Sequence, residues 1–96
     1  MNNNITENYE GHLFKVEFIV SYPLKHNSRG KSWAKCTQCV IYDNQRIMGF
    51  GECIKHSNDK DDNKYAKVYS AKKAFKQTRL WKEIRQRLWQ KILLTQ

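Results

Sequence analysis

The sequence predicts an α+β domain in which a three-stranded antiparallel sheet is followed by two C-terminal helices. Three observations predict it: alternating apolar residues near the N-terminus, two further β-rich segments joined by a short polar turn, and helical spacing of apolar residues in the last third of the chain. A length of 96 residues suits one domain. We therefore expect residues 13–96 to form a single α+β domain and the polar residues 1–12 to be disordered.

Residues 13–22 predict the first strand. Alternate positions in this segment are apolar, and the period of two places one set of side chains on a buried face: Phe14, Val16, Phe18, Val20 and Tyr22. Pro23 ends the strand, because proline has no N–H to donate to a neighbouring strand. The polar and basic residues 24–32 that follow predict an exposed loop.

Residues 33–42 and 46–56 predict the second and third strands, with a turn at residues 43–45, where Asp and Asn tolerate left-handed backbone angles. If the chain turns at Asn44-Gln45, Cys36 is expected to face Cys53. Gly49 and Gly51 are two residues apart, so they share one face of the third strand. Glycines in this arrangement predict the close approach of another element, and a helix is the simplest candidate.

Residues 57–63 predict the entry to a helix, because Asp and Asn cap free backbone amides. The first helix is expected to extend to about Gln77. Its predicted packing stripe combines aromatic, aliphatic and small residues: Tyr65, Ala66, Val68, Tyr69, Ala71, Ala74 and Phe75. Apolar residues at helical spacing predict a second helical stretch from Thr78, and we expect a bend or short break between the two.

Charge gives the strongest indication of function. The chain has a net charge of +9 and a pI near 9.6. From Lys60 to Gln96 there are eleven basic and three acidic residues, so almost all of the excess lies in the C-terminal third. This pattern is typical of proteins that bind nucleic acid. The residues expected to contact phosphates are Arg29, Lys31, Lys64, Lys67, Lys72, Lys73, Lys76, Arg79, Lys82, Arg85 and Lys91.

Residues 35–75 resemble the β-β-α half of double-stranded-RNA-binding domains. The resemblance is carried by Gly49-Phe50-Gly51, Lys64, Ala66 and Ala71-Lys72-Lys73-Ala74-Phe75. It implies that Lys64 and Lys67 contact phosphates across a major groove. The chain departs from that family in having no predicted N-terminal helix and three aspartates before the helix. A looser resemblance to small uncharacterised bacteriophage proteins, in residues 37–43 and 51–53, implies a viral accessory role.

Three cysteines and a histidine follow a spacing that zinc ribbons use, Cys36-x-x-Cys39 and Cys53-x-x-His56. In a continuous strand, however, Cys36 and Cys39 point to opposite faces and cannot bind one ion. We therefore interpret the cysteines as buried thiols. A zinc-ribbon-like module is the alternative, and no other cofactor is expected.

The sequence predicts no enzyme. The three histidines are isolated, and Asp59, Asp61 and Asp62 precede a helix, where capping is their simplest role. No apolar run approaches the ~20 residues of a membrane span. The first residues do not form a signal peptide. We therefore expect a cytoplasmic protein with no membrane partner.

A small non-enzymatic nucleic-acid-binding protein is the leading hypothesis. The alternative is a protein-binding inhibitor of a host nuclease or a CRISPR effector, an anti-defence protein. Such an inhibitor would dock through the apolar stripe of the terminal helix, which comprises Trp81, Ile84, Leu88 and Trp89. Packing of this stripe in the core of the same chain is equally consistent with the pattern. Self-association through it would give a homodimer.

Overall fold

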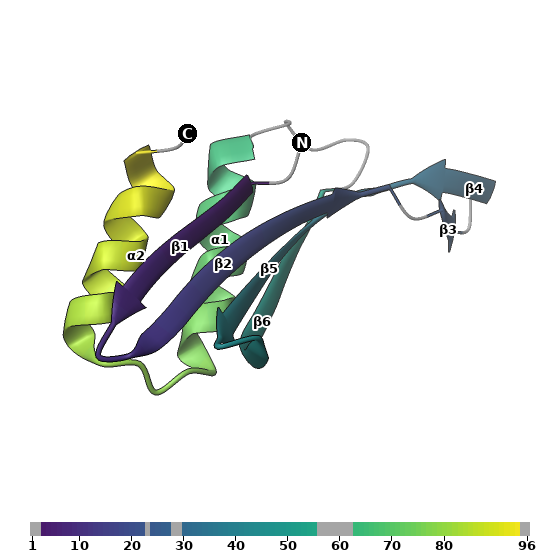
Figure 1. Ribbon diagram of the computed structural model, residues 1–96. Helices are drawn as coiled ribbons and strands as arrows, with labels where there is room; N and C mark the ends of the chain where they lie inside the picture. Colours follow the sequence, from purple (N-terminus) through teal and green to yellow (C-terminus); the bar gives the residue numbers. More distant parts are fainter. Residues whose placement is uncertain (1–2, 23, 28–29, 56–62, 95–96) are drawn as a thin grey trace.

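The structure is a computed structural model that describes residues 3–22, 24–27, 30–55 and 63–94. The elements in chain order are β1 (Asn3–Tyr9), β2 (His12–Ser21), β3 (Leu24–Asn27), β4 (Gly30–Trp33), β5 (Lys35–Asp43), β6 (Arg46–Lys55), α1 (Asn63–Lys76) and α2 (Lys82–Leu94). An antiparallel sheet in the spatial order β1-β2-β5-β6 precedes the two helices, and β3 pairs with β4 in a separate hairpin (Figure 1). The α+β class is confirmed, but the sheet has four strands and not three.

The additional strand, β1, occupies the segment for which the sequence predicts disorder. It pairs with β2 in a register that places Ile5 opposite Val16. Ile5 is buried in the core, whereas Glu7 and Tyr9 bind charged side chains of α2. Only one of these three helix-facing residues is a buried apolar side chain, so β1 lacks the apolar alternation that predicts a strand.

The hairpin of β5 and β6 turns at Asn44-Gln45, and both residues have the positive φ that a type I′ turn requires. The register of the two strands then shifts by one residue at Met48, which is left without a partner on β5. This β-bulge changes every pairing beyond it. Cys36 therefore faces Ile54, and the predicted pairing of Cys36 with Cys53 is wrong.

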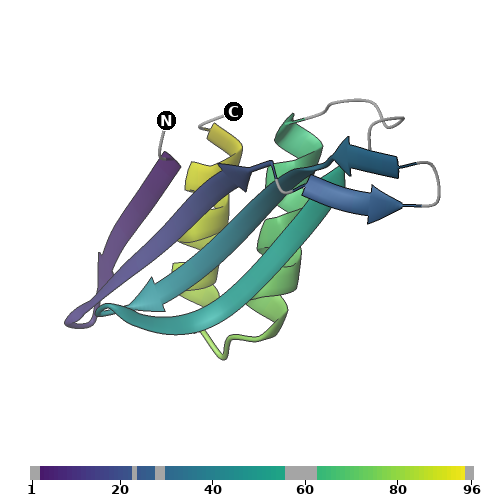
Figure 2. The same ribbon diagram turned by 90° about the vertical axis from the view of Figure 1, so that its right-hand side faces the viewer.

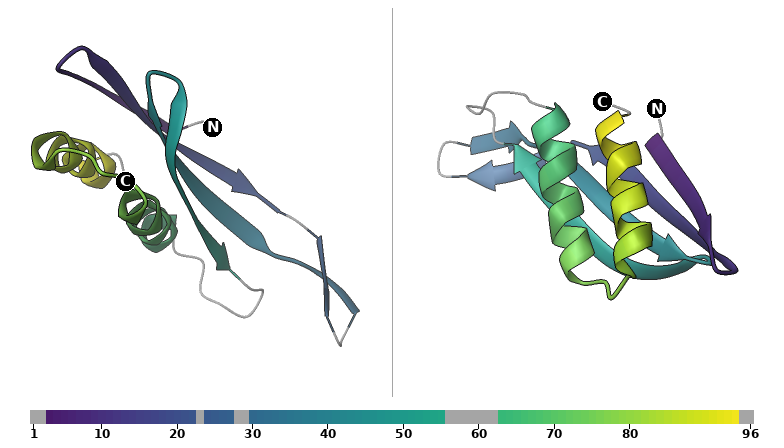
Figure 3. Two further views of the ribbon diagram at one scale, coloured as in Figure 1. Left: turned by 90° about the horizontal axis from the view of Figure 1, so that it is seen from below. Right: turned by 90° about the vertical axis from the view of Figure 1, so that its left-hand side faces the viewer.

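Both helices lie on the same face of the four-stranded sheet (Figure 3). The core fills the space between the two layers and comprises Ile5, Phe14, Val16, Phe18, Cys39, Ile41, Ala71, Ala74, Phe75, Ile84, Leu88 and Ile92. The helices are separate, as the expected break predicts, and the Thr78 hydroxyl donates a hydrogen bond to the Phe75 carbonyl where α1 ends (2.8 Å). No helix in the described ranges has the length and apolar character needed to cross a membrane.

β2 extends past the helix layer and leads to the β3–β4 hairpin, which projects as an arm from one end of the molecule (Figures 1 and 2). The sequence predicts a loop where this arm forms. Val20 and Tyr22 are exposed, although their alternation with Phe14, Val16 and Phe18 predicts burial. The helix layer ends before it reaches the last residues of β2, so no described helix covers them.

Candidate nucleic-acid interface

α1 packs against the edge strand β6 through two glycines. A Cβ atom at Gly49 would meet the carbonyl oxygen of Ala74, and one at Gly51 would meet the carbonyl oxygen of Ser70. The predicted close approach of a helix to these glycines is therefore present. The inner side of α1 is correspondingly small and buried, with Ser70, Ala71 and Ala74 fully inaccessible to solvent. This contact fixes which side chains α1 presents to solvent.

The side of α1 that points away from the sheet carries lysines and tyrosines together. We call it the α1 outer face and define it by Tyr65, Tyr69, Lys72, Lys73 and Lys76, all of which are exposed. The two tyrosines are 60% and 38% exposed, so their predicted place in the packing stripe is wrong. The residues that pack are the small ones and Phe75, because a close helix–sheet approach leaves no room for a tyrosine ring.

The rings on the α1 outer face form a column along the helix. Tyr65 and Tyr69 are four residues apart and stack, with ring centroids 5.6 Å apart and an angle of 21° between the ring planes. One turn further on, the Lys73 ammonium lies 4.5 Å from the centroid of the Tyr69 ring. Side chains four residues apart are neighbours on a helix surface, so this column follows from the helical spacing of the three residues.

The other predicted phosphate-binding residues vary in position. Lys64, Arg79, Lys82 and Arg85 are exposed, whereas Lys67 is half-buried with its ammonium 5.7 Å from the Phe18 ring centroid. Arg29 lies outside the described residues, and Lys31 belongs to β4 in the arm. Between residues 63 and 94, ten basic residues stand against one acid, Glu83. The helix layer is therefore strongly positive.

Lys91 differs from the other predicted lysines because it is held by β1. Its ammonium lies 2.6 Å from a carboxylate oxygen of Glu7 and donates a hydrogen bond to the Thr6 carbonyl oxygen at 2.8 Å. Arg87 contacts the same carboxylate at 3.8 Å. These contacts attach α2 to the edge strand β1, so Lys91 has a structural role that the sequence pattern does not reveal.

The apolar stripe of α2 lies mostly in the core. Ile84 and Leu88 are fully buried, and Trp89 is half-buried with its ring centroid 5.1 Å from that of Phe75. Trp81, at 52% exposed, is the accessible member of the predicted docking set. Of the alternatives that the sequence leaves open for this stripe, packing in the core of the same chain is the one found for Ile84 and Leu88.

The cysteines lie on both faces of the sheet. Cys36 and Cys39 point to opposite sides of the continuous strand β5, and the Cys36 thiol donates to a Glu52 carboxylate oxygen at 3.6 Å. Burial raises the pKa of the Cys39 thiol to about 12, so this thiol remains neutral. Within the described ranges, His, Cys, Asp and Glu residues form no cluster that could hold a metal ion. His56, the fourth predicted ligand, lies outside those ranges.

The face of the sheet opposite the helices carries exposed apolar side chains that the sequence analysis did not single out. They are Leu13, Ile19, Ile47, Phe50 and Ile54. They share this face with a small polar network in which Tyr42 donates to Glu17 at 3.3 Å and the Lys15 ammonium lies 5.0 Å from the Tyr42 ring centroid. Both signs of charge occur here, whereas the helix layer is almost entirely positive.

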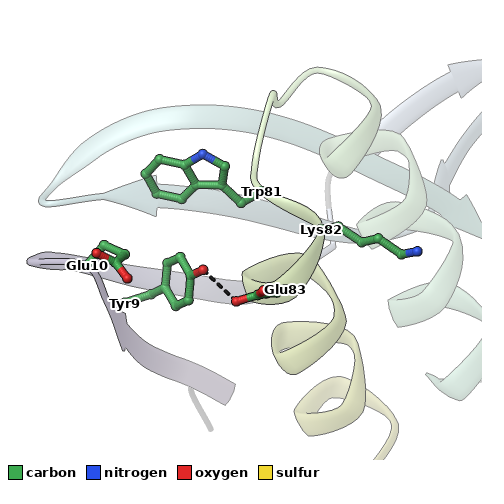
Figure 4. A pocket seen from close by; sticks show the side chains of 5 residues that line it. All are labelled: Tyr9, Glu10, Trp81, Lys82 and Glu83. Atoms are coloured by element: carbon green, nitrogen blue, oxygen red, sulfur yellow. Dashed lines mark hydrogen bonds between the residues drawn. The ribbon is translucent and has the colours of Figure 1, made fainter.

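A cavity of about 550 Å³ lies where the β1–β2 turn meets the start of α2 (Figure 4). Its lining is Tyr9, Glu10, Trp81, Lys82 and Glu83. The Tyr9 hydroxyl donates to Glu83 at 2.6 Å, and this hydrogen bond raises the pKa of Tyr9. The Lys82 ammonium points away from Tyr9 and Trp81. The hydrogen bond between Tyr9 and Glu83 connects β1 to the start of α2, so we interpret this cavity as part of the contact between the two elements.

Neither a protein-family model nor a curated protein nor a solved structure matches the chain. The description of the candidate site therefore comes from this structure alone. The site consists of lysines and stacked tyrosines on the outer side of α1, and two glycines of β6 fix the position of that helix. Sequence reasoning found the lysines and missed the tyrosines. The signal was available in the helical spacing, because Tyr65, Tyr69, Lys72 and Lys76 follow one another at intervals of four, three and four residues.

Proposed function

We propose that the protein binds nucleic acid through the lysines of α1. The observation that carries the proposal is that α1 has five lysines and no acidic residue in 14 positions. None of these lysines forms an ion pair with a residue in the described part of the chain. Phosphate groups are the natural partners for such a surface, because lysines that neutralise them release the counterions condensed on the nucleic acid.

A solvated helix face normally mixes both signs of charge, because opposite charges at i,i+4 stabilise a helix and like charges destabilise it. Lys72 and Lys76 form such a like-charged i,i+4 pair, and Lys73 lies between them in sequence. The free chain therefore bears a repulsion that a bound polyanion would relieve. This repulsion favours a ligand with several closely spaced negative charges, and it is less well matched by a partner that offers a single acidic side chain.

The alternative function, inhibition of a host nuclease or CRISPR effector by protein binding, depends on the apolar stripe of α2. Core packing now accounts for Ile84 and Leu88, because both are fully buried within the chain. The α1 lysines form no ion pair within the described structure, and Lys64, Lys72, Lys73 and Lys76 are exposed to a partner. Nucleic-acid binding is therefore the function that the geometry supports best.

The test is charge reversal on the α1 outer face. We expect Lys72→Glu combined with Lys73→Glu to weaken binding to a fluorescent oligonucleotide and to make the affinity less dependent on salt. If each lysine–phosphate contact contributes about −0.7 to the slope of log K against log salt for a single strand, loss of two contacts reduces the slope by about 1.4. Fluorescence anisotropy across a salt series measures both quantities.

The matched control is Lys15→Glu combined with Arg46→Glu, which changes the net charge equally but lies away from the α1 outer face. Lys15 is half-buried beside Glu17, and Arg46 is exposed at the start of β6. We expect this control to bind with a slope close to that of the unmodified protein. Equal losses of oligonucleotide affinity in the two variants would show that only the total charge matters. Unchanged affinity in the α1 variant would show that the α1 outer face is not the binding site.

A further inference from the structure

We propose that the preferred ligand is single-stranded nucleic acid, and that Tyr65 and Tyr69 stack on its unpaired bases. This inference rests on the proposed function and specifies the class of ligand for the same surface. It starts from the exposure of the two rings, which are 60% and 38% accessible. Both rings lie on the α1 outer face, among the lysines proposed to contact phosphates.

Lysines alone do not distinguish a duplex from a single strand, because both present a row of phosphates. Aromatic rings do, because the faces of paired bases are covered by the bases above and below them. Away from the ends of a duplex, a tyrosine ring can stack only on a base that has left the duplex or never entered it. Proteins that bind single strands combine a positive surface with aromatic side chains in this way, and the stacking is tolerant of sequence.

The ring geometry indicates where the bases would go. A base between two parallel rings needs them about 7 Å apart, two van der Waals contacts of about 3.5 Å. The Tyr65 and Tyr69 centroids are 5.6 Å apart, so a base does not fit between the rings as they stand. It would instead extend the column at one end, on the Tyr65 ring or in place of the Lys73 ammonium near Tyr69.

When a strand binds, Lys73 and Tyr69 can replace their contact with each other by contacts with the strand. Its ammonium lies 4.5 Å from the Tyr69 ring centroid in the free protein, and an exposed contact of this kind is weak. A bound strand offers a phosphate to the ammonium and a base to the ring. Both groups then have a better partner than they have in the free chain, and the phosphate and base contacts arise from adjacent side chains.

The experiment measures the binding of the full chain to three fluorescent DNA probes of about 20 nucleotides: oligothymidylate, an abasic strand and a duplex. The abasic strand keeps the phosphates of the first probe and lacks its bases. The variants are Tyr65→Ala with Tyr69→Ala, and Tyr65→Phe with Tyr69→Phe, which keeps the rings. Phe50→Ala is the control, because Phe50 is about as exposed as Tyr69 but lies on the opposite face of the sheet.

We expect the unmodified protein to bind oligothymidylate at least about tenfold more tightly than the duplex or the abasic strand. The double alanine variant should lose about tenfold in affinity for each tyrosine that stacks on a base, with an unchanged salt slope. Its affinity for the abasic strand should not change. The double phenylalanine variant and Phe50→Ala should bind oligothymidylate like the unmodified protein.

The outcomes separate this inference from the proposed function. Salt-dependent binding of all three probes with equal affinity, or a double alanine variant that binds oligothymidylate normally, overturns the single-strand inference and leaves the proposed function standing. Failure of the unmodified protein to bind any probe at low salt overturns both. Thermal unfolding of each variant, monitored by circular dichroism, verifies that a loss of binding does not reflect loss of the fold.

Discussion

Gly51 of β6 lies directly against Ala74 of α1: a Cβ atom on Gly51 would be 2.7 Å from the Ala74 backbone nitrogen. The same atom would be 2.8 Å from the Lys73 Cβ and would also meet the Ser70 carbonyl oxygen. Such separations are too short for real contacts, and most of the atoms involved belong to the backbone. The absence of a side chain at Gly51 therefore sets the distance between α1 and the sheet, and with it the position of the lysines and tyrosines.

The first prediction concerns this contact. Gly51→Ala should lower the free energy of unfolding by about 1–3 kcal/mol, because the helix must move to admit the methyl group. Urea denaturation measures the change. Ile47→Thr, at an exposed position of the same strand, should have a much smaller effect. Equal stability of Gly51→Ala and the unmodified protein would mean that α1 is not held this closely.

The second prediction concerns the apolar stripe of α2. Leu88 is fully buried, so Leu88→Ala should lower the free energy of unfolding by about 2–5 kcal/mol through lost packing and a residual cavity. Trp81→Ala should cost less, because the Trp81 side chain is half exposed. Thermal unfolding of both variants distinguishes core packing from a docking surface. A stable Leu88→Ala protein would revive the idea that the stripe serves a partner.

The third prediction separates two lysines that the sequence treats alike. Lys91→Gln should leave oligonucleotide affinity within about twofold of normal and lower stability by up to about 1 kcal/mol, since it breaks a partly exposed ion pair with Glu7. Lys72→Gln should instead reduce the affinity about threefold and raise stability by at most about 0.5 kcal/mol, because it removes the repulsion from Lys76. The paired measurements are anisotropy and urea denaturation. A larger affinity loss in Lys91→Gln than in Lys72→Gln would contradict the assigned roles.

The fourth prediction follows from the pKa of Cys39. Burial raises this pKa to about 12, so the thiol should resist iodoacetamide at pH 8 in the folded protein and react in denaturant. Cys53, which is half-buried, is the internal comparison. Mass spectrometry after digestion identifies the alkylated residue. Modification of Cys39 as fast as Cys53 in the folded protein would show that Cys39 is not buried.

The same pKa also predicts how stability changes with pH. The pKa of Cys39 in the folded protein lies above the ordinary pKa of a thiol, which applies in the unfolded chain. At pH values below that ordinary pKa the thiol is neutral in both states, and the stability that comes from burying it is fully present. As the pH rises from there toward about 12, ionisation of Cys39 in the unfolded chain increasingly favours unfolding. The contribution of Cys39 to stability should therefore decline only in alkaline solution. Urea denaturation of the unmodified protein and Cys39→Ala at neutral and alkaline pH isolates this contribution.

The order of the sheet and helices could be predicted because local patterns determine it. The alternation from Phe14 to Phe18 and the spacing of Ile84 and Leu88 reflect burial within single elements. β1 could not be predicted in this way, because its residues Glu7 and Tyr9 depend on partners in α2 that lie more than seventy positions away. The arm has a different reason: β3 and β4 pair with each other outside the four-stranded sheet, so packing against the helix layer imposes no apolar alternation on them.

The sequence indicates the positive charges of the candidate site but not its exposed aromatic side chains. Lysine at a solvated position is the expected choice, and Lys64, Lys72, Lys73 and Lys76 of α1 are exposed. The helical spacing of apolar residues predicts that Tyr65 and Tyr69 belong to the packing stripe. What excludes them is the contact of Gly49 and Gly51 with α1, which admits only small side chains on the inner face of the helix. That contact is between β6 and α1, which are separate segments of the chain. Its effect on the tyrosines can be seen only when the positions of both elements are known.

The central claim is that the lysines of α1 bind phosphates, and the most direct test is the salt dependence of affinity for a single-stranded oligonucleotide. The three lysines of the α1 outer face, at about −0.7 each, predict a slope near −2.1 in log K against log salt, so a fourfold rise in salt should weaken binding about 20-fold. A slope of this size that falls in Lys72→Glu/Lys73→Glu would support the claim. Absence of binding at low salt, or binding that is insensitive to salt, would contradict it.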